Sequence, residues 1–286
     1  MDDSPKDPKT AGLPNYHCNN QGTTMKNLVI KTLAATAALS ICSLPAFANC
    51  DALPSYATLK AALDTAVGTE GSGLDFDMWA TIVDRDGIVC QVAFSGGDRG
   101  AQWPGSRAIA AQKANTANAF SLDGLALSTA NLFSAVQPGG SLYGLQHSNP
   151  VDTDVAYGGP SGDYGTASDP MVGGKIGGVN VFGGGLALYS GGAVVGAVGV
   201  SGDTSCADHM IGWRVRDNLG LDDLDTTLGP AGLFAGDATH PDNIIYDIAG
   251  NSIGANQIGG TGISASGFGH PACLNTGDQS ALPAVD

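Results

Sequence analysis

The most apolar part of the chain has the pattern of a β-hairpin. Residues 179–189 and 193–200 are rich in Val, Leu, Ala and Gly, and residues 190–192 (Ser-Gly-Gly) separate them. Glycine supplies the positive φ that a tight hairpin turn requires. The pattern therefore predicts two buried antiparallel strands joined by this turn.

A helix is predicted directly after the hairpin. Asp203 or Thr204 is suited to cap its first amides, and Gly220 is suited to the position just past its end. The helix carries Cys206 and His209, so we expect this region to be the most informative about chemistry.

Three further helices and a second hairpin are predicted before this region. In these segments, apolar residues recur with the spacing of a helix or alternate as in a strand, and glycine or proline marks where each segment ends. The expected helices are 55–68, 104–120 and 125–136, the expected strands are 77–84 and 88–95, and 243–248 is a possible edge strand. This order predicts an α+β sandwich, in which an antiparallel sheet has helices on both faces.

Residues 141–175 form a long segment with no periodic element. The segment is rich in Gly, Pro, Asp, Ser and Asn. A loop of this length inside a domain usually has a role, such as a lid or an oligomer contact. We also expect about the last ten residues of the chain to fray.

The N-terminus has the pattern of an export signal. Residues 25–48 combine Lys26, a short apolar run and an Ala-Phe-Ala cleavage site, which is typical of a secretory signal peptide and too short for a spanning helix. Residues 1–24 are then an extension ahead of the true start. We expect a mature chain of one domain, 49–286, with a long C-terminal tail, in the periplasm or secreted and free of the membrane after cleavage.

The chain is strongly acidic, with a formal net charge of −15 at pH 7. An acidic chain is repelled by phosphate backbones and by anionic lipid. Nucleic acid and membrane surfaces are therefore excluded as expected partners.

Four cysteines remain in the mature chain, namely Cys50, Cys90, Cys206 and Cys273. An even number in an exported protein favours two disulfides, for which three pairings exist. We prefer Cys50–Cys90 with Cys206–Cys273, because this pairing ties each terminal segment to a central element. A thiolate metal site is the weaker interpretation, since the sequence has no CxxC or HExxH motif.

No familiar catalytic motif is complete. Ser201 follows a strand and precedes a helix, but the second glycine of a nucleophile elbow is missing, so Ser201 is interpreted as a turn residue. The histidines fit no chelating spacing. His209 stands out because Asp208 precedes it and Trp213 follows one turn later. A Cys206–Cys273 disulfide would also bring His270 within reach of His209.

Lys113 lies within an apolar stripe of the predicted helix 104–120. Two interpretations remain open for it. In the first, its aliphatic stem covers apolar surface while the ammonium reaches water; in the second, the ammonium faces an anionic ligand.

Several segments together resemble one family. They are PGSRAIAAQKANTANAF, QPGGSLYGL, the hairpin GGVNVFGGGLALYSGGAVVGAVGVSGD, the helix VSGDTSCADHMIGWRVR and the terminal GHPAC. They resemble the HbpS-like and GlcG-like haem-binding or haem-degrading family, in an exported branch that contains cysteine. The resemblance covers roughly residues 50–275.

The resemblance implies a profilin-like sandwich with about five strands, assembled into a homo-oligomer. Arg107 and Lys113 match the basic helix of the family, and Asp203 to Asp208 match its acidic loop. We therefore hypothesise an exported haem-binding protein. Arg107 and Lys113 would pair with the propionates and His209 would bind the iron. The full set of expected ligand-binding residues is Arg107, Lys113, Asp203, Asp208, His209, Trp213 and His270.

Two alternatives of other classes remain. The first is an enzyme that acts on a small organic acid or on haem, with Arg107 and Lys113 holding a carboxylate and Asp208 or His209 as general base. The second is a non-catalytic oligomeric sensor, in which the long loop and the acidic face bind another exported protein.

Overall fold

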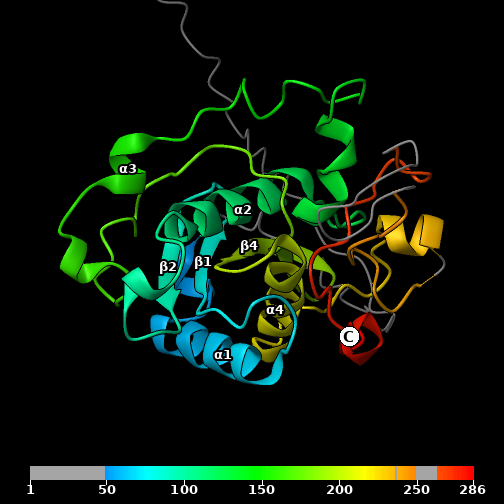
Figure 1. Cartoon of the computed structure of the whole chain (residues 1–286). Helices are drawn as coiled ribbons and strands as arrows, with labels where there is room; N and C mark the ends of the chain where they lie inside the picture. The colour runs from blue at the N-terminus through cyan, green and yellow to red at the C-terminus, as the bar shows by residue number, and fades with distance from the viewer. Residues whose placement is uncertain (1–48, 236, 249–262) are drawn as a thin grey trace, which may run out of the picture. The chain divides into compact units, whose positions relative to one another are not determined.

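The two predicted hairpins form one antiparallel sheet in the computed structural model, which describes residues 49–235, 237–248 and 263–286 (Figure 1). The hairpins join through their inner strands, so that the order is β2-β1-β4-β3 and Trp79 lies opposite Ser201. The strands are β1 (Trp79–Asp84), β2 (Val89–Phe94), β3 (Gly185–Ser190) and β4 (Ala193–Ser201). The predicted extension 1–24 and signal peptide 25–48 lie outside the described residues.

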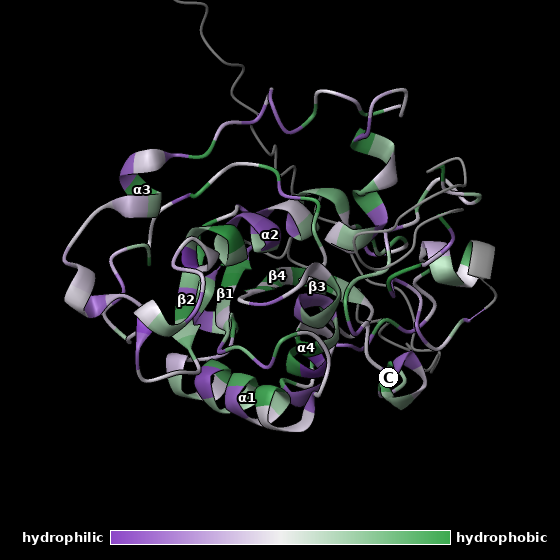
Figure 2. Ribbon diagram, in the orientation of Figure 1, coloured by the Kyte–Doolittle hydropathy of each residue, from purple (hydrophilic) through white to green (hydrophobic). Residues whose placement is uncertain are grey.

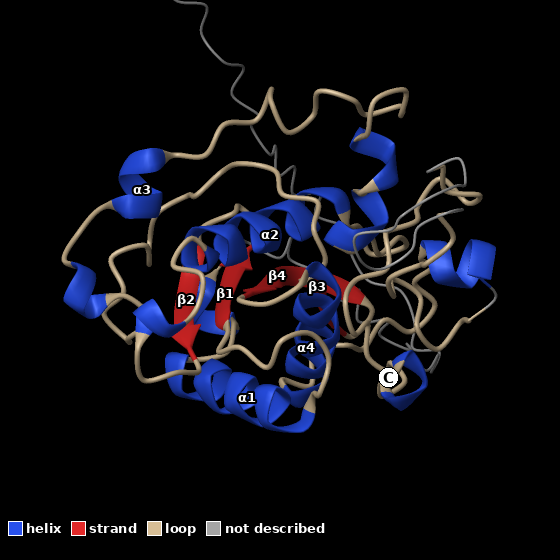
Figure 3. Ribbon diagram, viewed as in Figure 1, coloured by secondary structure: helices blue, strands red, loops and turns tan. Residues whose placement is uncertain are grey.

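Helices cover both faces of the sheet, which confirms the α+β prediction (Figures 1 and 3). One face packs against α2 (Ser106–Phe120), and the other packs against α1 (Tyr56–Thr69) and α4 (Ser205–Asn218). Because side chains alternate along a strand, Ala80 and Ile82 contribute to the core beneath α1 and α4, whereas Trp79 and Val83 contribute to the core beneath α2. Hydrophobic colour accordingly marks the strands and the inner sides of these helices (Figure 2).

Helix α2 lies close to β4 because small residues, among them Ala110, Ala114 and Gly199, face one another. A Cβ atom on Gly199 would lie 2.0 Å from the carbonyl oxygen of Ala110 and 2.4 Å from the amide nitrogen of Ala114. Glycine at this position is therefore required by the close approach of two backbones. The contact fixes α2, and with it Arg107 and Lys113, over the sheet.

Helix α4 begins as predicted. The Thr204 side chain accepts a hydrogen bond from the Ala207 amide, and Gly220 follows the helix with a φ of +60°. Most of its residues are buried, because the sheet, α1 and the C-terminal tail all pack on it. The Trp213 indole donates to the Pro283 carbonyl oxygen at 2.9 Å, so the expectation that the last residues fray was wrong.

The described part of the chain has a four-stranded sheet where about five strands were expected. Residues 243–248 are not a strand, and Ile248 forms only an isolated bridge with Ser264. The physical reason is that other partners use the backbone of this segment. The Ile244 amide donates to the Asn243 side chain, the Ile244 carbonyl accepts from Gln279, and the Ile245 carbonyl accepts from the His270 amide.

Other boundaries also differ from the predictions. The predicted helix 125–136 is two 3-10 turns, Thr129–Leu132 and Ser134–Val136. The first turn starts only at Thr129, where the Asn131 side chain accepts a hydrogen bond from the Ser128 amide and caps the start of the turn. Strand β3 begins at Gly185, six residues later than predicted. The 141–175 segment is largely irregular but includes the short helix α3 (Thr153–Tyr157).

No helix within the described residues has the length and apolar character needed to cross a membrane.

Candidate functional site

A cavity of about 430 Å³ lies where the first turns of α2 and α4 meet, and we call it the Lys113 cavity. Its apolar wall consists of Trp103, Ile109 and Phe182, of which Trp103 and Phe182 are 49% and 45% exposed. Its polar wall consists of Ser106, Lys113, Ser201, Asp203, Thr204, Ser205 and Asp208. The cavity therefore combines an open aromatic rim with a polar, charged wall.

Lys113 and Asp208 form a buried ion pair in this wall. The Lys113 ammonium donates to Asp208 Oδ2 at 2.6 Å and to the Val200 carbonyl oxygen at 3.0 Å. Burial lowers the pKa of Lys113, and burial raises the pKa of Asp208 to about 6 even though the ammonium opposes that shift. Lys113 thus does not reach bulk water. It is held inside the protein by Asp208, and it lines the cavity.

The other acidic residue of the loop, Asp203, has a structural role. Its carboxylate accepts hydrogen bonds from the amides of Leu74 and Phe76 at 2.8–3.1 Å. Asp208 Oδ1 in turn accepts from the amides of Gly202 and Asp203 at 3.0 and 2.9 Å. The two carboxylates therefore order the loop between β4 and α4 around the cavity.

Ser205 and His270 form a hydrogen-bonded pair at the edge of the cavity. Ser205 Oγ lies 2.7 Å from His270 Nε2, and His270 Nδ1 lies 2.6 Å from the Pro271 carbonyl oxygen. A carbonyl oxygen only accepts, so Nδ1 carries the proton, and Nε2 accepts from the serine hydroxyl. Burial lowers the pKa of His270 to about 4, which keeps the ring neutral at neutral pH.

His209 does not line the cavity, and the structure does not support it as an iron ligand. The side chain is fully buried, and Nε2 lies 3.0 Å from Asn243 Oδ1 and 3.1 Å from the Ile244 amide nitrogen. Its remaining nitrogen, Nδ1, is buried without a hydrogen-bond partner among the described residues. The ring holds α4 against residues 243–244, which is a structural role.

Trp213 is also buried away from the cavity. Its ring lies under the Arg216 guanidinium at 4.4 Å and beside His240 at 5.4 Å. Its contacts are with Arg216 and His209 of α4 and with His240 and Pro283, so the structure gives no support to the expectation that it packs on a ligand ring, which stays a prediction.

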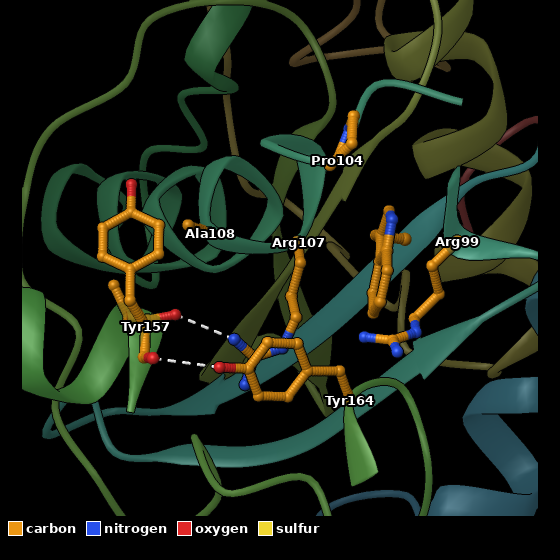
Figure 4. Close-up of a pocket in the computed structure, with 8 residues that line it drawn as sticks. Arg99, Pro104, Arg107, Ala108, Tyr157 and Tyr164 are labelled. Atoms are coloured by element: carbon orange, nitrogen blue, oxygen red, sulfur yellow. Dashed lines mark hydrogen bonds between the residues drawn. The ribbon is translucent and has the colours of Figure 1, made fainter. Parts of the chain in front are cut away.

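Arg107 lines a second, smaller cavity of about 170 Å³ together with Tyr157 and Tyr164 (Figure 4). Asp169 neutralises its guanidinium, since Nε donates to this carboxylate at 2.9 Å and Nη2 donates to it as well. Nη1 donates to the Ala156 carbonyl oxygen at 2.8 Å. The Tyr164 ring covers it at 3.7 Å. Arg107 therefore holds the 141–175 segment on α2, and it does not share a cavity with Lys113.

The structure has both disulfides of the preferred pairing, Cys50–Cys90 and Cys206–Cys273. The sulfur atoms are oxidised and are not thiolate ligands. The second disulfide brings His270 to α4, but its hydrogen-bond partner there is Ser205 and not His209. Sequence reasoning missed Ser205, because only the tail, 65 residues later, distinguishes it from an ordinary first-turn serine.

The burial of His209 predicts a pH dependence of stability. Burial lowers the pKa of His209 from 6.5 to about 4, so between these values the unfolded chain binds the proton and the folded chain does not. Stability contributed by the neutral ring is thus lost as the pH falls through this window. We expect His209→Gln to flatten the pH dependence of the free energy of unfolding by about 1 kcal/mol per pH unit near pH 5. Urea unfolding at several pH values measures this slope, and an unchanged slope would contradict the prediction.

Residues 57–214 match the family described as "Haem degrading protein HbpS-like", and the chain belongs to this family. A search of curated proteins found no match. Among solved structures, the chain is similar to the Klebsiella pneumoniae protein ORFY, assigned to DUF336, with 25% identity over 58% of this chain and 90% of that chain and a TM-score of 0.39. It is also similar to a PduOC:heme complex (23% identity, 57% and 89% covered, TM-score 0.39) and to a double mutant of Streptomyces reticuli HbpS (17% identity, 67% and 98% covered, TM-score 0.40).

Proposed function

We propose that this protein binds haem, and that the Lys113 cavity is the binding site. The observation that carries the proposal is the pair of exposed aromatic side chains, Trp103 and Phe182, at the rim of the largest apolar-walled cavity described above. Exposed apolar side chains that gather around a hollow mark ligand-binding sites, whereas single exposed ones are common on protein surfaces. Membership of the HbpS-like family supports tetrapyrrole as that partner.

The residues of the cavity fit part of what haem requires. Trp103, Ile109 and Phe182 offer apolar contacts to the porphyrin faces. Lys113 is paired with Asp208, and it offers a carboxylate the one N–H group that has no acceptor among the described residues. No histidine lines the cavity, and His270 lies behind Ser205. Binding through the ring and its carboxylates is therefore what these residues support, and His209 is not part of it.

A hemin titration of the full chain, followed by its visible spectrum, tests this proposal. We expect a saturable Soret shift, and we expect Trp103→Ala and Phe182→Ala each to weaken binding about five- to tenfold, because each removes about 1 kcal/mol of aromatic contact. His209→Gln should leave the spectrum unchanged.

Tyr143→Ala is the matched control, because Tyr143 is also an exposed aromatic residue (63%) but does not line the Lys113 cavity. Equal weakening by Tyr143→Ala would indicate nonspecific association of hemin. A spectrum that changes on His209→Gln, in a variant that remains folded, would show that the iron lies elsewhere.

We also propose that the protein is exported, and the two disulfides support this, since disulfides persist in oxidising compartments. The alternative of an enzyme that holds a small acid with both Arg107 and Lys113 loses support, because these residues line different cavities. Assembly into a homo-oligomer and a role as a sensor stay predictions.

A further inference from the structure

The Ser205–His270 pair has the arrangement of a nucleophile and its base. The Ser205 hydroxyl donates to His270 Nε2 at 2.7 Å, and the Pro271 carbonyl oxygen, 2.6 Å from Nδ1, holds the ring in the tautomer that leaves Nε2 free to accept. A third group that orients the base completes this kind of arrangement. The Gly183 amide donates to Ser205 Oγ at 2.7 Å and fixes its position.

The surroundings of Ser205 supply access and hydrogen-bond donors, although the carboxylates of Asp203 and Asp208 also line the cavity. Ser205 is partly exposed and lines the Lys113 cavity, whereas His270 is only 3% exposed. Ser205 is the first residue of α4, where the helix dipole favours negative charge. Lys113 lines the same cavity, and two of its three N–H groups have acceptors among the described residues.

We propose that Ser205 is a catalytic nucleophile that hydrolyses small carboxylic esters in the Lys113 cavity. Trp103 and Phe182 would contact the apolar part of the ester. The Lys113 ammonium and the first turn of α4 would stabilise the negative charge that develops on the carbonyl oxygen.

The reaction balances with water as the only co-reactant. Ser205 Oγ forms a bond to the acyl carbon as its proton moves to His270 Nε2, and the carbonyl electron pair moves onto oxygen. The intermediate then expels the alcohol oxygen, which takes the proton from Nε2. Water attacks the acyl-serine in the same way and releases the acid, which restores the Ser205 hydroxyl and neutral His270.

The disulfide and the tail explain how two distant residues form this pair. Cys206 follows Ser205 directly, and it is bonded to Cys273, three residues after His270. Phe133 packs against the His270 ring at 4.9 Å. The base therefore comes from the tail beyond residues 57–214, which are those that match the family.

Labelling the haem-free full chain with an alkyl fluorophosphonate tests the proposal by intact mass and peptide mapping. We expect one adduct, located on Ser205 and absent in Ser205→Ala. We expect His270→Gln to slow labelling about a hundredfold, which is the usual contribution of a general base. Ser55→Ala is the matched control, because Ser55 also stands at the start of a helix, and this variant should label at the wild-type rate.

Absence of an adduct on Ser205 in the folded wild type, or an unchanged rate in folded His270→Gln, would overturn the proposal. If His270→Gln does not fold, a burst of p-nitrophenol from p-nitrophenyl acetate decides instead, since the wild type should show it and Ser205→Ala should not. Haem and the ester would occupy the same cavity, so labelling uses the haem-free chain and the two proposals are tested separately. Labelling without hemin binding would contradict only the proposed function, and hemin binding without labelling would contradict only this inference.

Discussion

Replacing Asp242 by alanine is expected to lower the free energy of unfolding by about 3–5 kcal/mol, because the substitution leaves a buried guanidinium without its counter-charge. Arg216 donates to the two carboxylate oxygens of Asp242 at 2.7 and 2.8 Å, and both side chains are fully buried. Among the described residues, no other carboxylate forms an ion pair with Arg216. Its further acceptor is the Ala187 carbonyl oxygen, at 3.4 Å.

Urea unfolding monitored by circular dichroism measures this effect. Asp64→Ala is the matched control, since it removes the carboxylate of the Lys60–Asp64 pair, whose side chains are 31% and 45% exposed. We expect that variant to change the free energy of unfolding by less than about 0.5 kcal/mol. Similar effects in the two variants would show that the Arg216–Asp242 pair is solvated in solution.

Removing the Cys206–Cys273 disulfide by Cys206→Ala with Cys273→Ala is expected to cost about 4 kcal/mol, from the chain entropy that a cross-link over this separation removes from the unfolded state. The two cysteines are 67 residues apart in the sequence. The variant should also release His270 from Ser205, because the tail loses its covalent tie to α4.

The other disulfide separates these two effects. Cys50 and Cys90 are 40 residues apart, so Cys50→Ala with Cys90→Ala should lower stability by a similar amount. That variant should leave Ser205 and His270 in contact. A loss of less than about 1 kcal/mol in the free energy of unfolding for Cys206→Ala with Cys273→Ala would contradict the entropic estimate. It would indicate that other contacts, such as the Trp213–Pro283 hydrogen bond, hold the tail.

The local elements were predictable where their causes are local. Apolar or alternating segments with glycine at the turn identified both hairpins. Asp203 or Thr204 and Gly220 marked the two ends of α4, and the structure has Thr204 as the cap, since caps and turns depend on a few neighbouring residues. Residues 243–248 have the same apolar character, yet they are not a strand. Whether an apolar segment becomes a strand depends on a neighbouring edge, which the segment itself does not encode.

The partners of the charged and polar side chains were not predictable in the same way. Lys113 and Arg107 lie on one helix and both suggested anion binding, but Asp208 neutralises one and Asp169 neutralises the other. His209 was the expected ligand on α4, whereas the residue of α4 that reaches the cavity beside a histidine is Ser205.

The sequence by itself determined the α+β order, the two hairpins, the ends of α4 and the resemblance to the HbpS-like family, and it favoured one of three disulfide pairings. Only the tertiary structure decided which side chains face the Lys113 cavity. The reason is that helix periodicity gives the direction of a side chain only relative to its own helix. What lies in that direction depends on segments far away in the sequence, here the tail that places His270 on Ser205 and the loop that places Asp169 on Arg107.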